Sequence, residues 1–167
     1  MPLGARSLRY LLFASVALLS VSCDQGTKIW ARSALAGRGS VPVIDGFWDF
    51  HLAQNTGAAF SLLRDSSFGR ALLSAVGVFL LGMILWWLKT VIDKGWLPVA
   101  ALALIFGGAV GNLWDRIVYG SVTDFVYWHG RTFSWPVFNV ADAVLLVGAV
   151  LMFFSGATRR RESTSQP

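Results

Sequence analysis

The stretch WLPVAALALIFGGAVGNLWDR, residues 96–116, combines two features that decide the class of fold. Residues 96–114 are almost entirely apolar, and a helix of about 20 residues crosses roughly 30 Å of hydrocarbon. The run ends in a polar block that contains Asn112, Asp115 and Arg116. The stretch therefore predicts a membrane-spanning helix that carries ionisable groups at one end.

Three further apolar segments have the same character, at residues 8–23, 71–88 and 137–156. The chain is 55% hydrophobic and only 14% charged, whereas soluble domains carry about 25% charged residues. Lipid offers no partner to backbone polar groups, so each span must be helical. We predict one membrane-embedded domain over residues 1–167, membrane α-helical, with four transmembrane helices at about 8–28, 71–88, 96–114 and 137–156.

Basic residues mark one side of this predicted bundle. They are Arg6, Arg9, Lys89, Lys94, Arg159, Arg160 and Arg161. By the positive-inside rule, both termini and the 89–94 loop are cytoplasmic. The segments 31–65 and 115–136 then face outward, and their β-branched and aromatic residues predict short strands, including SVTDFVYW and TFSW around the turn HGR. The tail 157–167 is polar and carries no motif.

The same topology gathers polar residues at the outer ends of the spans. They are Asp24, Asn112, Asp115, Arg116, Asn139 and Asp142, joined by Asp124 from the second outer segment and Asn55 from the first. Ionisable groups at membrane depth usually face a bundle interior and mark a functional site. Less specific interpretations exist for each: Asn139 and Asp142 could cap a helix, Asp24 and Lys28 could form a surface ion pair, Asp115 and Arg116 could lie in solvent, and Asp124 could be an exposed strand residue.

The residue types in this cluster favour carboxylate chemistry. No serine has a plausible His or Lys partner, Cys23 has no nearby histidine, and His51 and His129 lack the spacing of a zinc site. We therefore expect no metal and no cofactor. Two aspartates that share one proton can activate water and protonate a scissile carbonyl, which is aspartyl proteolysis.

Three pairs remain possible from the residues alone: Asp124–Asp142, Asp115–Asp142 and Asp24–Asp142. Asp24 has Lys28 four residues on, and Asp115 has Arg116 beside it. The pair Asp124–Asp142 has no adjacent cation in the sequence and is favoured for that reason. Two rival interpretations of the whole chain are a four-span transporter and a lipoprotein precursor that is itself cleaved before Cys23.

Five blocks together resemble the lipoprotein signal peptidases (signal peptidase II) in order and spacing. They are DQGTK at 24–28, NTGAAFS at 55–61, GNLWDR at 111–116, VTDF at 122–125 and FNVAD at 138–142. The resemblance implies an aspartic endopeptidase with four helices, a small periplasmic β-cradle and the catalytic dyad Asp124 and Asp142. It implies polar support or substrate binding from Asp24, Lys28, Asn55, Asn112, Arg116 and Asn139, and we place Gly57 and Asp115 of the same blocks in this group.

The resemblance also implies the setting in which the chain works. Members of the family are multi-pass proteins of the bacterial inner membrane, with the active site near the periplasmic face. They cut prolipoproteins just before a diacylglyceryl-modified cysteine, and the cyclic peptide globomycin targets them. We therefore expect prolipoproteins and membrane lipids as partners, no nucleic acid, and a monomer that keeps its own first helix.

Overall fold

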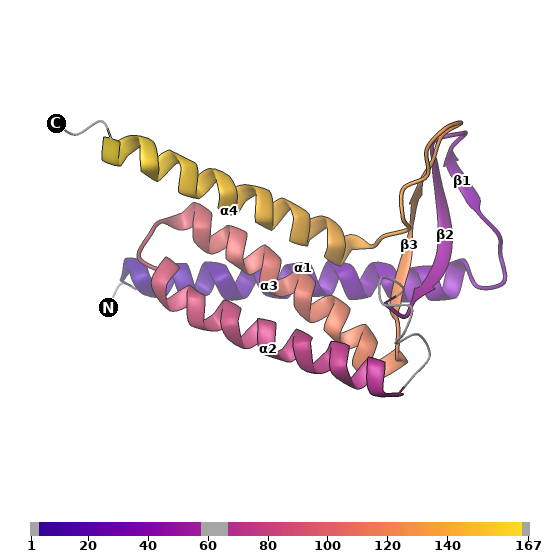
Figure 1. The fold of residues 1–167 in the computed structure, drawn as a ribbon, viewed down its shortest axis with the longest axis horizontal. Helices are drawn as coiled ribbons and strands as arrows, with labels where there is room; N and C mark the ends of the chain where they lie inside the picture. Colours follow the sequence, from indigo (N-terminus) through magenta and orange to yellow (C-terminus); the bar gives the residue numbers. More distant parts are fainter. Residues whose placement is uncertain (1–3, 58–66, 165–167) are drawn as a thin grey trace.

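The computed structural model describes residues 4–57 and 67–164, and within them long helices follow each apolar segment (Figure 1). The elements are α1 (Ala5–Ala34), β1 (Val41–Ile44), β2 (Trp48–Asn55), α2 (Ser67–Val91), α3 (Trp96–Tyr119), β3 (Val122–Trp128) and α4 (Val140–Thr164). Each helix runs several residues beyond the span expected for it at one end or both. The predicted class, a membrane α-helical fold with a small sheet, is confirmed.

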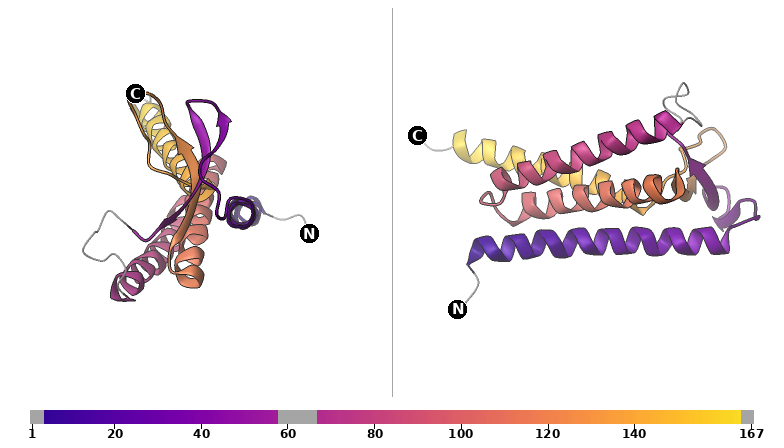
Figure 2. Two further views of the ribbon diagram at one scale, coloured as in Figure 1. Left: turned by 90° about the vertical axis from the view of Figure 1, so that its right-hand side faces the viewer. Right: turned by 90° about the horizontal axis from the view of Figure 1, so that it is seen from below.

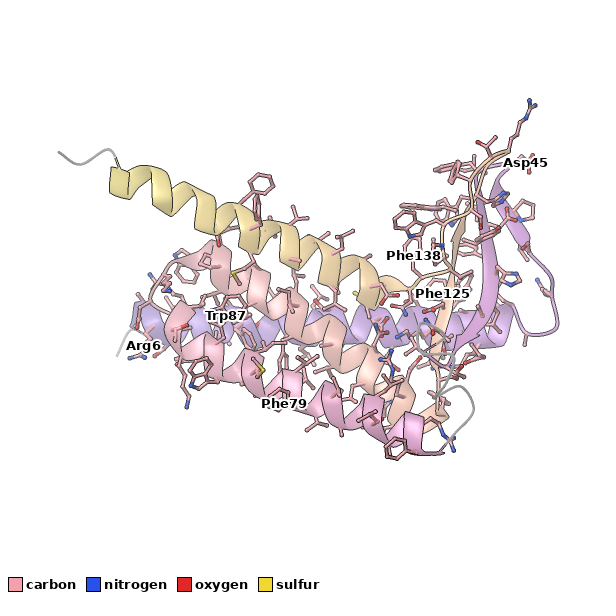
Figure 3. All side chains as sticks on the ribbon, viewed as in Figure 1. Arg6, Asp45, Phe79, Trp87, Phe125 and Phe138 are labelled. Carbon is pink, nitrogen blue, oxygen red and sulfur yellow. The ribbon has the colours of Figure 1, made fainter. Side chains whose placement is uncertain are left out.

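Three of these helices are long and apolar enough to cross a membrane, among the described residues: Ala5–Ala34, Phe68–Val91 and Trp96–Tyr119. The apolar part of α4, Val140–Gly156, is shorter. It begins later than the predicted span at 137–156, because Asn139 ends the preceding loop and caps the helix. Large apolar side chains such as Phe79 point outward from the bundle, as expected of surfaces that face lipid (Figure 3).

Helix α3 is the centre of the bundle, since it packs against α1, α2 and α4. Figure 2 shows α1 and α2 on different sides of it. Glycines permit the close approach of α3 and α4. A Cβ atom on Gly148 of α4 would lie 2.7 Å from the Ala101 carbonyl oxygen and 2.8 Å from Cγ1 of Ile105, both on α3. The contact between these two helices therefore depends on residues without side chains.

The sheet lies at one end of the bundle, where α1 and α3 end and α2 and α4 begin (Figure 1). Its strands are antiparallel in the order β1-β2-β3. Phe125 of β3 packs with Ala31 and Leu35 at the end of α1, which fixes the sheet on the helices. Figure 3 shows Phe125 and Phe138 at this junction, far from Arg6 and Trp87 at the other end.

One expected strand is absent from the described residues. TFSW, residues 132–135, contributes only an isolated bridge between Ser134 and His129, and the next bridge joins Phe138 to Val126. Pro136 lies between the two bridges and has no N–H to donate to a ladder. The prediction of a strand here was wrong, and the segment instead leads the chain from the sheet into α4.

We predict that Gly148→Ala lowers the stability of the bundle, because the added methyl group must push α3 and α4 apart. Overpacking of this kind costs about 1–3 kcal/mol. Thermal unfolding of the purified protein in detergent measures the effect. Gly82→Ala on α2 is the matched control, since a Cβ there meets nothing within 4 Å. Equal unfolding midpoints for the two variants would contradict the packing of α3 against α4.

Candidate active site

Asn139 immediately precedes α4 and organises the polar cluster from a fully buried position. Its Oδ1 accepts a hydrogen bond from the backbone N–H of Asp142 at 3.0 Å, and Oδ2 of Asp142 accepts one from the backbone N–H of Asn139 at 3.2 Å. This reciprocal pair is a capping box that satisfies two backbone donors at the start of the helix. The capping interpretation is therefore correct, and the cap also holds the Asp142 carboxylate in place.

The side-chain amide of Asn139 links the cap to a second carboxylate. Its Nδ2 donates to Oδ1 of Asp124 at 2.6 Å and to Oδ1 of Asn112 at 3.1 Å. Asn112 in turn donates from Nδ2 to Oδ1 of Asp142 at 2.8 Å. Asp124 from β3 and Asp142 from α4 thus lie on either side of the same two asparagines. The fold brings together two acids that are 18 positions apart in the chain.

Asp124 is only 2% exposed, so the interpretation of it as a solvated strand residue was wrong. Burial raises the pKa of its carboxyl group from 3.8 to about 6. Hydrogen bonds from Asn55 and Asn139 act in the opposite direction, while the charge of Asp142 raises the pKa further. The Asn55 bond, from Nδ2 to Oδ2 of Asp124, is 3.0 Å long. Asp124 therefore retains a proton to higher pH than an ordinary aspartate.

Lys28 forms the centre of a second, fully buried cluster directly beside the first. Its Nζ lies 2.9 Å from Oδ2 of Asp24, 3.7 Å from Oδ2 of Asp115 and 2.9 Å from Oδ1 of Asn112. The side chains of Lys28 and Asp24 have no exposed surface, so the surface ion pair considered from the sequence is wrong. Oδ1 of Asp24 also accepts the backbone N–H of Ala141 at 2.9 Å, which ties α1 to the first turn of α4.

Asp115 differs from expectation in its partners. The sequence suggested Arg116 as its charge partner. The Asp115 carboxylate instead lies near Lys28 and 3.6 Å from Nη1 of Arg32, and it accepts a hydrogen bond from the backbone N–H of Thr123 at 2.8 Å. Adjacent residues on a helix point about 100° apart, which separates Asp115 from Arg116. Arg116 donates to the carbonyl oxygen of Asn112 at 3.3 Å and lies within range of the charges of Asp142 and Asp124.

Arg32 and Gln25 belong to the cluster but were not predicted from the sequence. Arg32 donates to Oγ1 of Thr123 at 2.9 Å and stacks over the Tyr119 ring at 4.2 Å, and Nε2 of Gln25 donates to Oδ2 of Asp24 at 3.0 Å. The spacing of Asp24, Lys28 and Arg32 at four-residue intervals is a signal that could have placed Arg32 on the same helix face.

Gly57 supports Asn55 from the end of β2. It has φ +88°, a conformation that favours glycine, and its N–H donates to Oδ1 of Asn55 at 2.9 Å. This bond orients the Asn55 amide so that its Nδ2 faces Asp124. Residues 58–61 of the NTGAAFS block lie outside the described residues.

A groove of about 290 Å³ between α2, α3 and α4 leads to the cluster. Its lining residues are Leu73, Val76, Gly77, Leu80, Ala109, Asn112, Leu113, Arg116 and Leu145. Most of them are apolar, whereas Asn112 and Arg116 form a polar end next to Asp142. Among the described residues, no group of three or more His, Cys, Asp or Glu side chains is arranged to hold a metal ion.

Comparison with known proteins agrees with this geometry. A family model described as signal peptidase (SPase) II matches residues 16–157. The chain belongs to this family. Within the family, it is 38% identical over 141 residues to the lipoprotein signal peptidase of Xanthomonas euvesicatoria pv. vesicatoria (strain 85-10), covering 84% of this chain and 82% of the relative. It is 36% identical over 141 residues to that of Xylella fastidiosa (strain M12), covering 84% of each.

Two solved structures give the same fold. One, a bacterial membrane enzyme determined in meso at 2.3 Å resolution, has a TM-score of 0.74 and 26% identity, covering 92% of this chain and 91% of that one. Another, at 1.9 Å resolution, has a TM-score of 0.70 and 27% identity, covering 86% and 90%. As a member of the signal peptidase II family, the chain is a peptidase.

We predict that Lys28→Met strongly destabilises the protein, because it leaves Asp24 buried without its cation. Removing one partner of a buried ion pair costs about 3–5 kcal/mol. Thermal unfolding in detergent measures the loss, with Lys89→Met at the opposite end of the bundle as the control. Adding Asp24→Asn to Lys28→Met should restore part of the stability. An unchanged unfolding midpoint for Lys28→Met would show that the pair does not stabilise the fold.

Proposed function

We propose that the chain removes signal peptides from prolipoproteins as an aspartic endopeptidase, with Asp124 and Asp142 as its catalytic dyad. The observation that carries this proposal is the arrangement of the two carboxylates around Asn139 and Asn112. Among the described residues, neither carboxylate has a basic group within 4 Å, whereas Asp24 and Asp115 both do. Asp124 and Asp142 are therefore the two acids of the cluster best able to share one proton.

The proposed reaction starts with Asp124 protonated and Asp142 ionised. Asp142 takes a proton from a water molecule, whose oxygen attacks the scissile carbonyl carbon, while Asp124 donates its proton to the carbonyl oxygen. A neutral tetrahedral diol results. As the C–N bond breaks, Asp142 passes its proton to the leaving nitrogen, and one diol hydroxyl returns a proton to Asp124. Both aspartates then have their initial protonation states, and no metal or cofactor takes part.

The groove between α2, α3 and α4 supplies a place for the substrate. Its apolar side chains, such as Val76, Leu80 and Leu113, suit the apolar segment of a signal peptide. Its polar end at Asn112 and Arg116 then lies at the bond to be cut, beside Asp142. In this arrangement the cleaved bond precedes a diacylglyceryl-modified cysteine, whose acyl chains remain in the surrounding lipid.

Charge distribution supports an orientation with the site near the periplasmic face of the bacterial inner membrane. Arg6 and Arg9 lie at the end of the bundle opposite the sheet, where they contact the loop after α2: Arg6 is 3.7 Å from Asp93, and Arg9 donates to the Ile92 carbonyl oxygen at 2.9 Å. By the positive-inside rule this end is cytoplasmic, as are both termini. We further propose that the chain acts as a monomer and is a target of globomycin.

The course of α1 argues against a substrate lipoprotein as the identity of this chain. The helix continues without a break through Cys23 to Ala34, and residues on both sides of Cys23 pack on α3. Cleavage before Cys23 would divide the helix that supplies Asp24 and Lys28 to the cluster. The chain therefore fits the role of the enzyme better than that of the cleaved precursor.

We predict that Asp124→Asn and Asp142→Asn each bind a diacylglyceryl-modified precursor but fail to cut it. Loss of a general acid or base costs about 10²–10⁴-fold in rate. A gel-shift assay of the lipidated precursor measures cleavage, and co-purification of the precursor measures binding. Asp45→Asn, at the exposed tip of the sheet, is the control and should cleave at the wild-type rate. Retained cleavage by either dyad variant would remove that residue from the mechanism.

We predict that kcat/KM falls as the pH rises through the pKa of Asp124, about 6 in the free enzyme, because the general acid then loses its proton. Asn55→Ala removes a hydrogen bond that favours the carboxylate, so the pKa of Asp124 should rise. The alkaline limb of the pH profile should therefore move upward, by about half a pH unit or more. Asp45→Asn should leave it in place. A limb that stays fixed or moves downward in Asn55→Ala would contradict the role given to Asp124.

A further inference from the structure

A second cavity, of about 330 Å³, lies at the sheet end of the bundle between the start of α2 and the end of α3. Its lining residues are Arg70, Ala71, Ser74, Arg116, Ile117, Val118, Tyr119 and Gly120. It shares Arg116 with the groove proposed for the substrate but no other lining residue. The two cavities therefore adjoin at this one arginine.

The charged side chains that line this cavity are both cationic. Arg70 and Arg116 both line it, and within residues 4–57 and 68–156 neither guanidinium has a carboxylate within 4 Å. Arg70 belongs to the first turns of α2, where the helix dipole adds partial positive charge. Two guanidinium groups and a helix N-terminus around one cavity favour an anionic ligand.

Gly120 makes room for the Arg70 side chain. A Cβ at this position would lie 2.8 Å from Nη1 of Arg70, and the backbone has φ +77°, which also favours glycine. Arg70 is thus accommodated against the end of α3. Arg70 is thereby held at the wall of the cavity, which Arg116 and Ser74 also line.

The surroundings of the cavity are apolar and open. Phe68 is 68% exposed, Ile117 63% and Tyr119 50%, and Leu72 continues the exposed apolar surface along α2. In a membrane-spanning bundle such surfaces face acyl chains, and the aromatic rings of Phe68 and Tyr119 suit the interfacial depth. A ligand that fits both features has an anionic head and apolar tails.

We propose that Arg70 and Arg116 hold the phosphate of an anionic phospholipid, with its acyl chains along the exposed faces of α2 and α3. The phosphodiester oxygens accept hydrogen bonds from the two guanidinium groups, the geometry for which arginine is best suited. Arg116 also lies within range of Asp142, so the lipid site adjoins the peptidase site. Free inorganic phosphate shares the head chemistry but would leave the apolar surroundings without a partner.

Native mass spectrometry of the full chain, with phosphatidylglycerol and phosphatidylcholine titrated into the detergent micelle, tests the proposal. Wild-type protein should retain phosphatidylglycerol in preference to phosphatidylcholine. Arg70→Gln should weaken phosphatidylglycerol binding about fivefold, since a basic residue at an anionic membrane surface contributes on the order of 1 kcal/mol. Its affinity for phosphatidylcholine and its thermal midpoint should not change.

Lys89→Gln, on the last turn of the same helix, is the matched control and should bind phosphatidylglycerol as the wild type does. Equal phosphatidylglycerol binding by Arg70→Gln and wild type would overturn the proposal. Displacement of the lipid by millimolar inorganic phosphate would also overturn it, in favour of a free phosphate site. An increased KM for the lipidated precursor, with lipid binding intact, would assign Arg70 to the substrate instead. None of these results depends on whether Asp124 and Asp142 form the dyad.

Discussion

The site depends on one buried cation. Lys28 has no exposed side-chain surface, and a charge removed from water is tolerated only when other groups replace its hydration. Here Asp24, Asp115 and Asn112 do so, and they come from α1 and α3. Asp24 uses its second oxygen to hold the first turn of α4 through Ala141. The charge requirement of a single lysine therefore fixes the relative positions of three helices at the sheet end of the bundle.

Lys28 also determines how the asparagines face the two acids. An ammonium group can only donate, so the atom of Asn112 that it meets must be the oxygen, and the amide nitrogen then faces Asp142. The same oxygen of Asn112 accepts a hydrogen bond from Nδ2 of Asn139. This Nδ2 also donates a hydrogen bond to Asp124. Each carboxylate consequently meets an amide donor. The amide orientations, which could otherwise be exchanged, follow from the position of the lysine.

Much of this arrangement could be predicted from the sequence, because long apolar runs in lipid must be helical and the polar blocks occur at the same ends of those runs. Burial was harder to predict. Asp124 lies on an alternating strand, and only the register of β3 with β2, Ala53 opposite Asp124, determines that it faces the helices. The charge partners of Asp115 are Lys28 and Arg32, which lie more than 80 positions away in the chain. The neighbouring position of Arg116 in the sequence therefore predicted the wrong partner. Long-range packing decided both.

The balance of charge in the cluster favours a single proton on the proposed dyad, Asp124 and Asp142. Among the described residues of the cluster, Asp24 and Asp115 are matched by Lys28 and Arg32, which leaves Arg116 as the remaining cation in range of Asp124 and Asp142. With both dyad acids ionised the cluster would carry a net charge of −1, whereas one shared proton makes it neutral. Net charge is costly in a buried, lipid-bordered site, and burial raises the pKa of Asp124, which favours the protonated form of its carboxyl group. The cations that stabilise the bundle thus also favour the protonation state that the proposed mechanism requires.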